Sequence, residues 1–292
     1  MKHLASWIGV QVLLLSVLAS CQKGPAWLLR IRPKLGDTLH YLINIHQKLH
    51  TMGIDMRQHY RIYQNVSFSR FYGDSAFDLT SSIQRIIIHQ WIPVADTVTT
   101  FYFDSQKPDS VSKRFDIIGR VFKEVVGKEF NIRVTSTGRV IQSDFERVWK
   151  KVVLPGSTLP GSSPMVLSKN TTLEQFLASL PQRPVRKGDT YIVTSQLGLA
   201  PELPLNTNTQ FTVESLTDAG VVLRYSAHFN SPDTGRYENF FKGHQNGYCL
   251  LDGKSLMVRT NAYMQQAQMN LSILGYRNLV NTHTFVATYL LP

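Results

Sequence analysis

Hydrophobic and polar residues alternate along two neighbouring segments, residues 39–49 and 56–68. The apolar positions of the first are Leu39, Tyr41, Ile43, Ile45 and Leu49, and those of the second are Met56, Tyr60, Ile62, Val66 and Phe68. A period of two is typical of a strand with one buried face. The two sets have opposite parity. A hairpin through residues 51–54 that places Ile45 opposite Tyr60 and Ile43 opposite Ile62 therefore keeps both sets on one face.

The rest of the chain predicts more strands and a few helices. Strands are expected over 77–91, 98–103, 128–135, 221–229 and 282–291, with turns at 136–139, 218–220 and 252–253. Helical spacing of apolar residues predicts a helix over 109–126. Further helices are expected over 143–152 and over 171–180, where Thr171 or Thr172 can cap the start. The expected fold class is α+β and β-dominated, with curved, half-barrel-like antiparallel sheets and two or three helices.

A short motif occurs twice. Arg-Pro followed by Gly-Asp-Thr stands at residues 32–38 and again at 183–190, each time before a strand. Two readings stay open: a duplicated unit, or chance use of a common turn sequence. The predicted organisation is a first β-rich half over 36–153, a Pro/Gly/Ser linker over 154–170 and a second β-rich half over 171–292, with the halves packed as one assembly.

The first 35 residues predict an export signal and a lipid anchor. Lys2 precedes an apolar stretch, Leu4–Leu18, which is too short to span a bilayer and suits a signal peptide. Leu18-Ala19-Ser20-Cys21 resembles a bacterial lipobox, which implies cleavage of residues 1–20 after Ser20 and acylation of Cys21, with palmitate among the chains. Residues 21–35 would then be a lipidated tether. The alternative is an ordinary secretory signal with an incidental cysteine.

Composition narrows the class of protein. The 292 residues carry a formal charge of +11, which loss of Lys2 lowers to +10, and 43% are hydrophobic, so a disordered chain is excluded. Two cysteines exclude a disulfide scaffold, and Cys249, within a strand, is expected to be a small buried hydrophobe. The basic residues are scattered without a nucleic-acid-binding motif, so anionic envelope surfaces are the expected partners and nucleic acid is not.

The lipobox, the paired Gly-Asp-Thr motifs, the long hairpins and the Pro-Gly linker together resemble an uncharacterised family of Gram-negative lipoproteins. The architecture is also similar to the half-barrel carriers of the lipoprotein-localisation class. These resemblances imply a lipid-anchored protein of the cell envelope. Gln22-Lys23 after the cysteine lacks an inner-membrane retention signal, which favours the outer membrane. Neither resemblance assigns a catalytic residue.

The polar face of the first hairpin is the candidate ligand site. It gathers His46, Lys48, Arg57, His59 and Arg61, whose like charges are unfavourable together unless water or an anionic ligand neutralises them. A lipid phosphate or an acidic polysaccharide would serve, and a plain solvated face is the alternative. His40, His46 and His50 lie too far apart along one strand to ligate one metal, so no metal or cofactor is expected.

The function expected from the sequence is non-catalytic binding of a hydrophobic or anionic envelope ligand, or of a partner protein, on a curved sheet. One alternative is an envelope hydrolase whose serines or carboxylates converge only in the fold, although Gly-x-Ser-x-Gly and His-Glu-x-x-His motifs are absent. The other is a structural component of an outer-membrane complex. The carboxylates considered are Asp104, Asp109, Asp116, Glu124, Glu202, Glu214 and Glu238.

Overall fold

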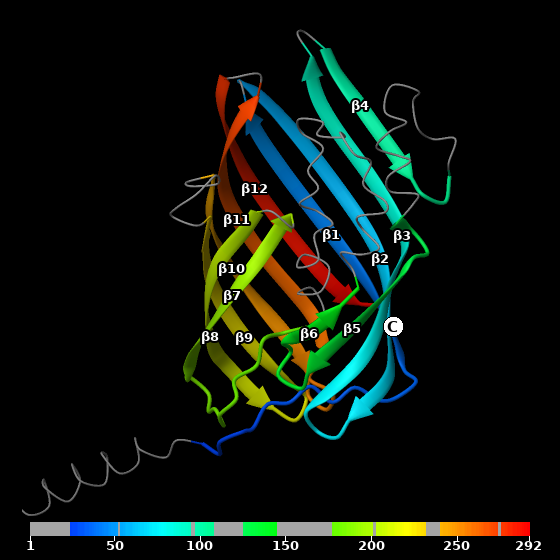
Figure 1. Ribbon diagram of the computed structural model, residues 1–292, viewed down its shortest axis with the longest axis vertical. Coiled ribbons are helices and arrows are strands. Elements are labelled where there is room, and N and C mark those ends of the chain that lie inside the picture. Colours follow the sequence, from blue (N-terminus) through cyan, green and yellow to red (C-terminus); the bar gives the residue numbers. More distant parts are fainter. Residues whose placement is uncertain are drawn as a thin grey trace, which may run out of the picture.

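The computed structural model describes residues 24–51, 53–94, 97–107, 125–144, 177–200, 203–231, 240–273 and 276–292. Within them, twelve strands form one antiparallel sheet in the order β6-β5-β3-β2-β1-β12-β11-β10-β9-β8-β7, with β4 paired to β3 (Figure 1). The strands are β1 (Thr38–Thr51), β2 (Ile54–Tyr72), β3 (Ala76–Val94), β4 (Thr97–Asp104), β5 (Glu129–Thr135), β6 (Val140–Ser143), β7 (Thr190–Ala200), β8 (Leu203–Thr217), β9 (Gly220–Asn230), β10 (Phe241–Asp252), β11 (Val258–Ile273) and β12 (Tyr276–Leu290).

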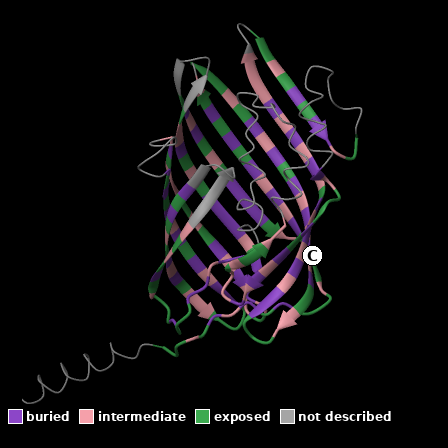
Figure 2. Cartoon of the chain, in the orientation of Figure 1, coloured by how far each residue is buried: buried purple, intermediate pink, exposed green. Residues whose placement is uncertain are grey.

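The sheet is rolled into an open curve. β1 and β12 pair at its centre, so strands from the two halves of the chain form one continuous surface. The edges, β5 and β6 on one side and β7 and β8 on the other, curl toward the viewer in Figure 1. Burial alternates along each strand, as the banding in Figure 2 shows, because successive side chains point to opposite faces. We call the face that carries Tyr41 and Ile43 the inner face, and the opposite one the outer face.

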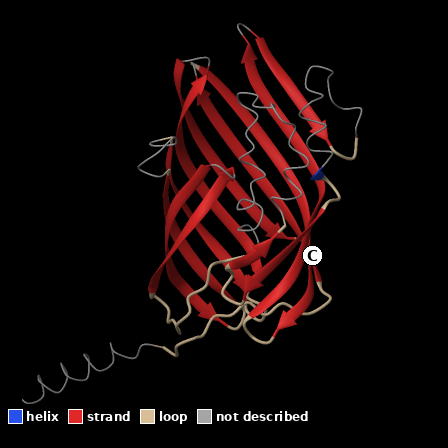
Figure 3. Ribbon diagram, viewed as in Figure 1, coloured by secondary structure: helices blue, strands red, loops and turns tan. Residues whose placement is uncertain are grey.

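The predicted α+β class is wrong. The described residues are nearly all antiparallel strand, with essentially no helix (Figure 3). Most residues of the three expected helices, over 109–126, 143–152 and 171–180, lie outside the described residues, as does the expected linker over 154–170. Residues 177–180, which are described, are not helical.

The first hairpin has the register that its alternating pattern predicts. Ile43 pairs with Ile62 and Ile45 with Tyr60, and the link ends at Thr51 and Ile54. Gly53, in that link, has a φ of 74°, in the left-handed region that favours glycine. The turns expected at 136–139, 218–220 and 252–253 are also confirmed, because each joins two strands there.

The two Gly-Asp-Thr motifs adopt the same local structure. The Gly36 and Gly188 amides donate hydrogen bonds to the carbonyls of Phe68 and Val213, at 3.0 and 2.7 Å. The amides of those same two residues donate back to the carbonyls of the aspartates that follow each glycine, and the next threonine begins β1 or β7. Each motif therefore anchors the start of a strand to the strand beside it, which explains why the sequence recurs.

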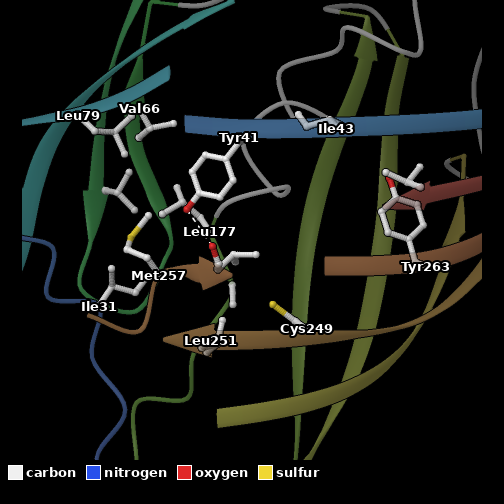
Figure 4. Close-up of a cluster of buried hydrophobic side chains, with 14 of the residues drawn as sticks. Ile31, Tyr41, Ile43, Val66, Leu79, Leu177, Cys249, Leu251, Met257 and Tyr263 are labelled. Atoms are coloured by element: carbon white, nitrogen blue, oxygen red, sulfur yellow. Dashed lines mark hydrogen bonds between the residues drawn. The ribbon is translucent and has the colours of Figure 1, made fainter. Parts of the chain in front are cut away.

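One end of the curve is closed by a packed apolar core. The Tyr41 ring is fully buried there, and its hydroxyl donates to the Val258 carbonyl at 3.0 Å. Ile31 from the segment before β1, Leu177 from the connection before β7, and Met257 from the β10–β11 turn surround it (Figure 4). Three segments remote in sequence thus cap this end of the inner face, which we call the closed end.

Candidate functional site

The five residues predicted to bind an anion lie together on the outer face of the β1–β2 hairpin. His46 pairs with His59, Lys48 with Arg57, and Arg61 with Asn44. The imidazoles of His46 and His59 stack with their centroids 3.9 Å apart and an angle of 18° between the rings. The structure therefore brings these residues into three adjacent rows across the hairpin, although binding of an anion is not tested by this geometry.

The stack extends into strands that the sequence did not connect with it. His89 of β3 pairs with His59, Tyr102 of β4 pairs with His89, and Phe285 of β12 pairs with His46. The His89 ring meets the Tyr102 ring edge-on, with centroids 5.8 Å apart. We call Tyr102, His89, His59, His46 and Phe285 the outer histidine row. The sequence does not single out His89, because Ile87 and Trp91 share its parity and the neighbouring strand cannot be read from the sequence.

The hairpin face is electropositive. Neither Lys48, Arg57 nor Arg61 forms an ion pair with any described residue. Burial, together with the neighbouring His46, Arg61 and His89, lowers the pKa of His59 to about 4. Its Nε2 atom is buried without a hydrogen-bond partner in the described structure. At neutral pH the positive charge on this face therefore comes from lysine and arginine, while His59 stays neutral.

Two of the carboxylates considered for a hydrolase, Asp104 and Glu214, lie among the described residues, and each pairs with an arginine. Arg85 contacts both carboxylate oxygens of Asp104, at 3.0 and 2.6 Å, and this hydrogen bonding holds the pKa of Asp104 below its usual range. Glu214 forms an ion pair with Arg224 at 2.8 Å. The other carboxylates considered for a hydrolase lie outside the described residues. Asp104 and Glu214, two of the seven candidate carboxylates, thus form ion pairs with arginines.

The inner face is uncharged across the sheet. Four rows of residues, which pass through Ile43, Ile45, Gln47 and Leu49, cross up to ten strands in continuous register. Their paired members include no Asp, Glu, Lys, Arg or His. Toward the β8–β12 side these rows carry small residues, Thr207, Thr209, Ala227, Gly243, Gly247, Ala267, Thr282 and Thr284. Aromatic residues alternate with them in the same rows, and the rings of Phe229 and Tyr225 lie against Gly243 and Gly247.

One of these rows is polar over six consecutive strands. It runs Gln90, Gln58, Gln47, Thr284, Gln265 and Gln245, from β3 to β10, and we call it the inner glutamine row. Tyrosine hydroxyls from the row beside it contribute: Tyr60 donates to Gln58 Oε1 at 2.5 Å, and Gln245 Nε2 donates to the Tyr225 hydroxyl at 3.4 Å. The signal for this row is present in the sequence, because Gln47 and Gln58 have the parity of the buried residues in their strands.

The predicted anchor and the strand cysteine lie in different parts of the chain. Ser20 and Cys21 lie outside the described residues, so cleavage and lipidation stay predictions. Cys249 is buried as expected, and burial raises the pKa of its thiol to about 12. No group of three or more His, Cys, Asp or Glu side chains in the described part of the chain is arranged to hold a metal ion. No helix among the described residues has the length and hydropathy to cross a membrane.

Comparisons with known proteins give information about the fold and assign no function. No family model matches the chain, and no curated protein matches its sequence. A solved structure on lipid–protein interactions in lipovitellin is similar over 89% of this chain, with 9% sequence identity and a TM-score of 0.52. This chain spans 25% of the length of that one. An outer membrane channel from Pseudomonas putida F1 aligns over 90% of this chain and 98% of its own, with 6% identity and a TM-score of 0.33, which is too low to support an argument. The chain thus shares a large antiparallel sheet with part of lipovitellin.

Proposed function

We propose that this protein is a non-catalytic, lipid-anchored protein of the bacterial envelope that holds an apolar ligand against the inner face of its curved sheet. The observation that carries the proposal is the continuous, uncharged inner face. About eight strands enclose an interior that their own side chains fill, and larger sheets enclose more. This sheet has twelve strands, and along β8–β12 its inner face alternates small residues with aromatic ones.

Two further observations support an apolar ligand. On β1 and β2 the charged side chains stand on the outer face, and the large buried apolar side chains stand on the inner one. The fold also resembles part of lipovitellin, a protein studied for its interactions with lipid. A fold does not fix a function, so the chemistry of the inner face carries the weight.

Native mass spectrometry of the purified protein tests this proposal. We expect a reproducible extra mass on the protein that is released into organic solvent. A clean ligand-free mass from protein purified without detergent would contradict the proposal, because the inner face would then be covered by protein alone. It would favour the alternatives, an envelope enzyme or a structural component of a complex.

The anchor is tested separately. If Cys21 is acylated, the Cys21→Ala variant loses membrane association and appears in the soluble fraction, since two or more acyl chains are needed for stable anchoring. Unchanged membrane association, with no lipid attached to the native Cys21, would contradict the anchor. This experiment bears on location and leaves the ligand proposal untouched.

A second candidate function concerns the outer face. Lys48, Arg57 and Arg61 have no acidic partner among the described residues, which favours contact with an anionic surface. Arg57→Glu combined with Arg61→Glu should weaken binding of the protein to phosphatidylglycerol vesicles at low salt. Lys187→Glu with Lys254→Glu, a pair of exposed lysines outside this hairpin, is the matched control. Equal losses in both double variants would leave the hairpin as a solvated face.

A further inference from the structure

The inner glutamine row is the longest polar run among the four inner rows, in which Asn261, Thr288, Thr207 and Thr282 are also polar. On the side of the closed end it meets the main core, which includes Ile43 and Ile45. On the other side lies a second apolar cluster made of Leu205, Phe229, Phe241 and Ala267. Buried polar groups cost free energy unless they find hydrogen-bond partners. A polar row across six strands therefore lowers the free energy gained by burying this face, unless its side chains find hydrogen-bond partners.

Gln47 shows where a partner is lacking. Its side chain is 5% exposed, and its Nε2 donates to Thr284 Oγ1 at 3.2 Å. Its Oε1 is buried with no hydrogen-bond partner in the described structure. The hydroxyl oxygen of Thr207, in the next row toward the second apolar cluster, is also buried and unpartnered. Buried unpaired atoms of this kind call for an explanation, and a bound molecule is one.

The absence of charge limits what that molecule is. The four inner rows contain no acidic, basic or histidine side chain at their described positions. A carboxylate or phosphate placed there would lose its water without gaining a counter-charge, which is strongly unfavourable. An uncharged hydroxyl or amide loses much less, and it supplies the proton that Gln47 Oε1 lacks.

We propose that the inner glutamine row binds the uncharged polar group of a long-chain amphiphile, and that the protein selects neutral amphiphiles over ionised ones. The ligand's hydroxyl or amide N–H donates to Gln47 Oε1, and its chain lies on the apolar surface beside the row. This inference rests on the proposed function, because it names the class of ligand that the inner face takes.

Two probes with the same chain length test the selectivity: palmitamide, which is neutral, and palmitate, which is ionised at about pH 8. We expect the delipidated protein to bind palmitamide at least about tenfold more tightly than palmitate, measured by native mass spectrometry titration. Equal affinities, or tighter binding of palmitate, would overturn the inference while leaving apolar binding in place. Binding of neither probe, with no lipid found on the native protein, would instead remove the proposed function itself.

Variants locate the contact. Gln47→Leu should lower the affinity for palmitamide about tenfold and leave palmitate binding almost unchanged, because it removes a hydrogen bond that only the neutral probe makes. Gln266→Leu is the matched control, since Gln266 follows Gln265 in β11 but is exposed on the outer face. Gln245→Leu, at a half-buried position of the same row, repeats the test if Gln47→Leu does not fold. Unchanged selectivity in a folded variant at either position would overturn the assignment.

Discussion

Acid should destabilise this protein through His59 in particular. In the folded state burial and its basic neighbours lower the pKa of His59 to about 4, whereas an unfolded histidine titrates near about 6.5. The folded state therefore disfavours the protonated ring. The stability that depends on neutral His59 is fully present above about pH 6.5 and is lost as the pH falls toward about 4.

The size of the effect follows from the two pKa values. At about pH 5 the full shift would cost about 2 kcal/mol relative to high pH. The ring keeps part of its contact with water, so about 1 kcal/mol is the expected loss. His59→Gln keeps a polar, neutral side chain but removes the titration. The free energy of unfolding in urea, measured at about pH 7 and about pH 5, should fall by about 1 kcal/mol less in this variant than in the native protein.

His228→Gln is the matched control, because His228 is exposed on the outer face of β9 and lies outside the outer histidine row. Its loss of stability between the two pH values should equal that of the native protein. If the native protein and His59→Gln lost the same free energy, the uncharged state assigned to the half-buried His59 ring would be refuted. Titration of carboxylates affects all three proteins alike and cancels from the comparison.

Three other predictions concern the core. Tyr41→Phe removes the hydrogen bond to the Val258 carbonyl and should lower the free energy of unfolding by about 1–2 kcal/mol in urea titrations. Gly247→Ala should cost about 1–3 kcal/mol in the same assay, since an added Cβ would lie 2.5 Å from the Ala262 carbonyl oxygen. The Cys249 thiol should not react with Ellman's reagent until the protein unfolds, because it is buried with its pKa raised to about 12.

Each of these three predictions has a control variant or a result that would contradict it. Tyr248→Phe, at a tyrosine that is 49% exposed, should leave stability unchanged. Gly24→Ala should do the same, because an added Cβ there meets nothing within 4 Å. Rapid reaction of Cys249 in the native protein would show that the closed end opens readily.

Local sequence patterns account for the first hairpin but not for the architecture. Alternation fixed the face of each residue in β1 and β2, and opposite parity with a turn fixed their register. The pairing of β1 with β12 joins residues more than two hundred positions apart, and no local pattern specifies such a partner. The expected helices came from apolar spacing and capping residues, and most of their residues lie outside the described part of the chain, which forms a single sheet.

The two candidate sites also depend partly on local sequence patterns and partly on long-range strand pairing. The basic face of the β1–β2 hairpin follows from that hairpin's register, whereas His89 joins it through a strand pairing that includes an irregularity near Tyr63. The inner glutamine row had a local signal in the polar residues that share parity with buried neighbours. Its continuation through Thr284 and Gln265 depends on the central pairing of the two halves, which only the structure supplies.

Photo-crosslinking with a diazirine analogue of palmitamide tests the central claim most directly, because it reports which face the ligand touches. The account predicts that labelled residues, mapped by peptide mass spectrometry, fall on inner positions such as Gln47, Ala227 and Thr284. Their chain neighbours His46 and Ser226, which point to the outer face, should stay unlabelled. Labelling concentrated on outer positions, with the inner rows untouched, would contradict the account.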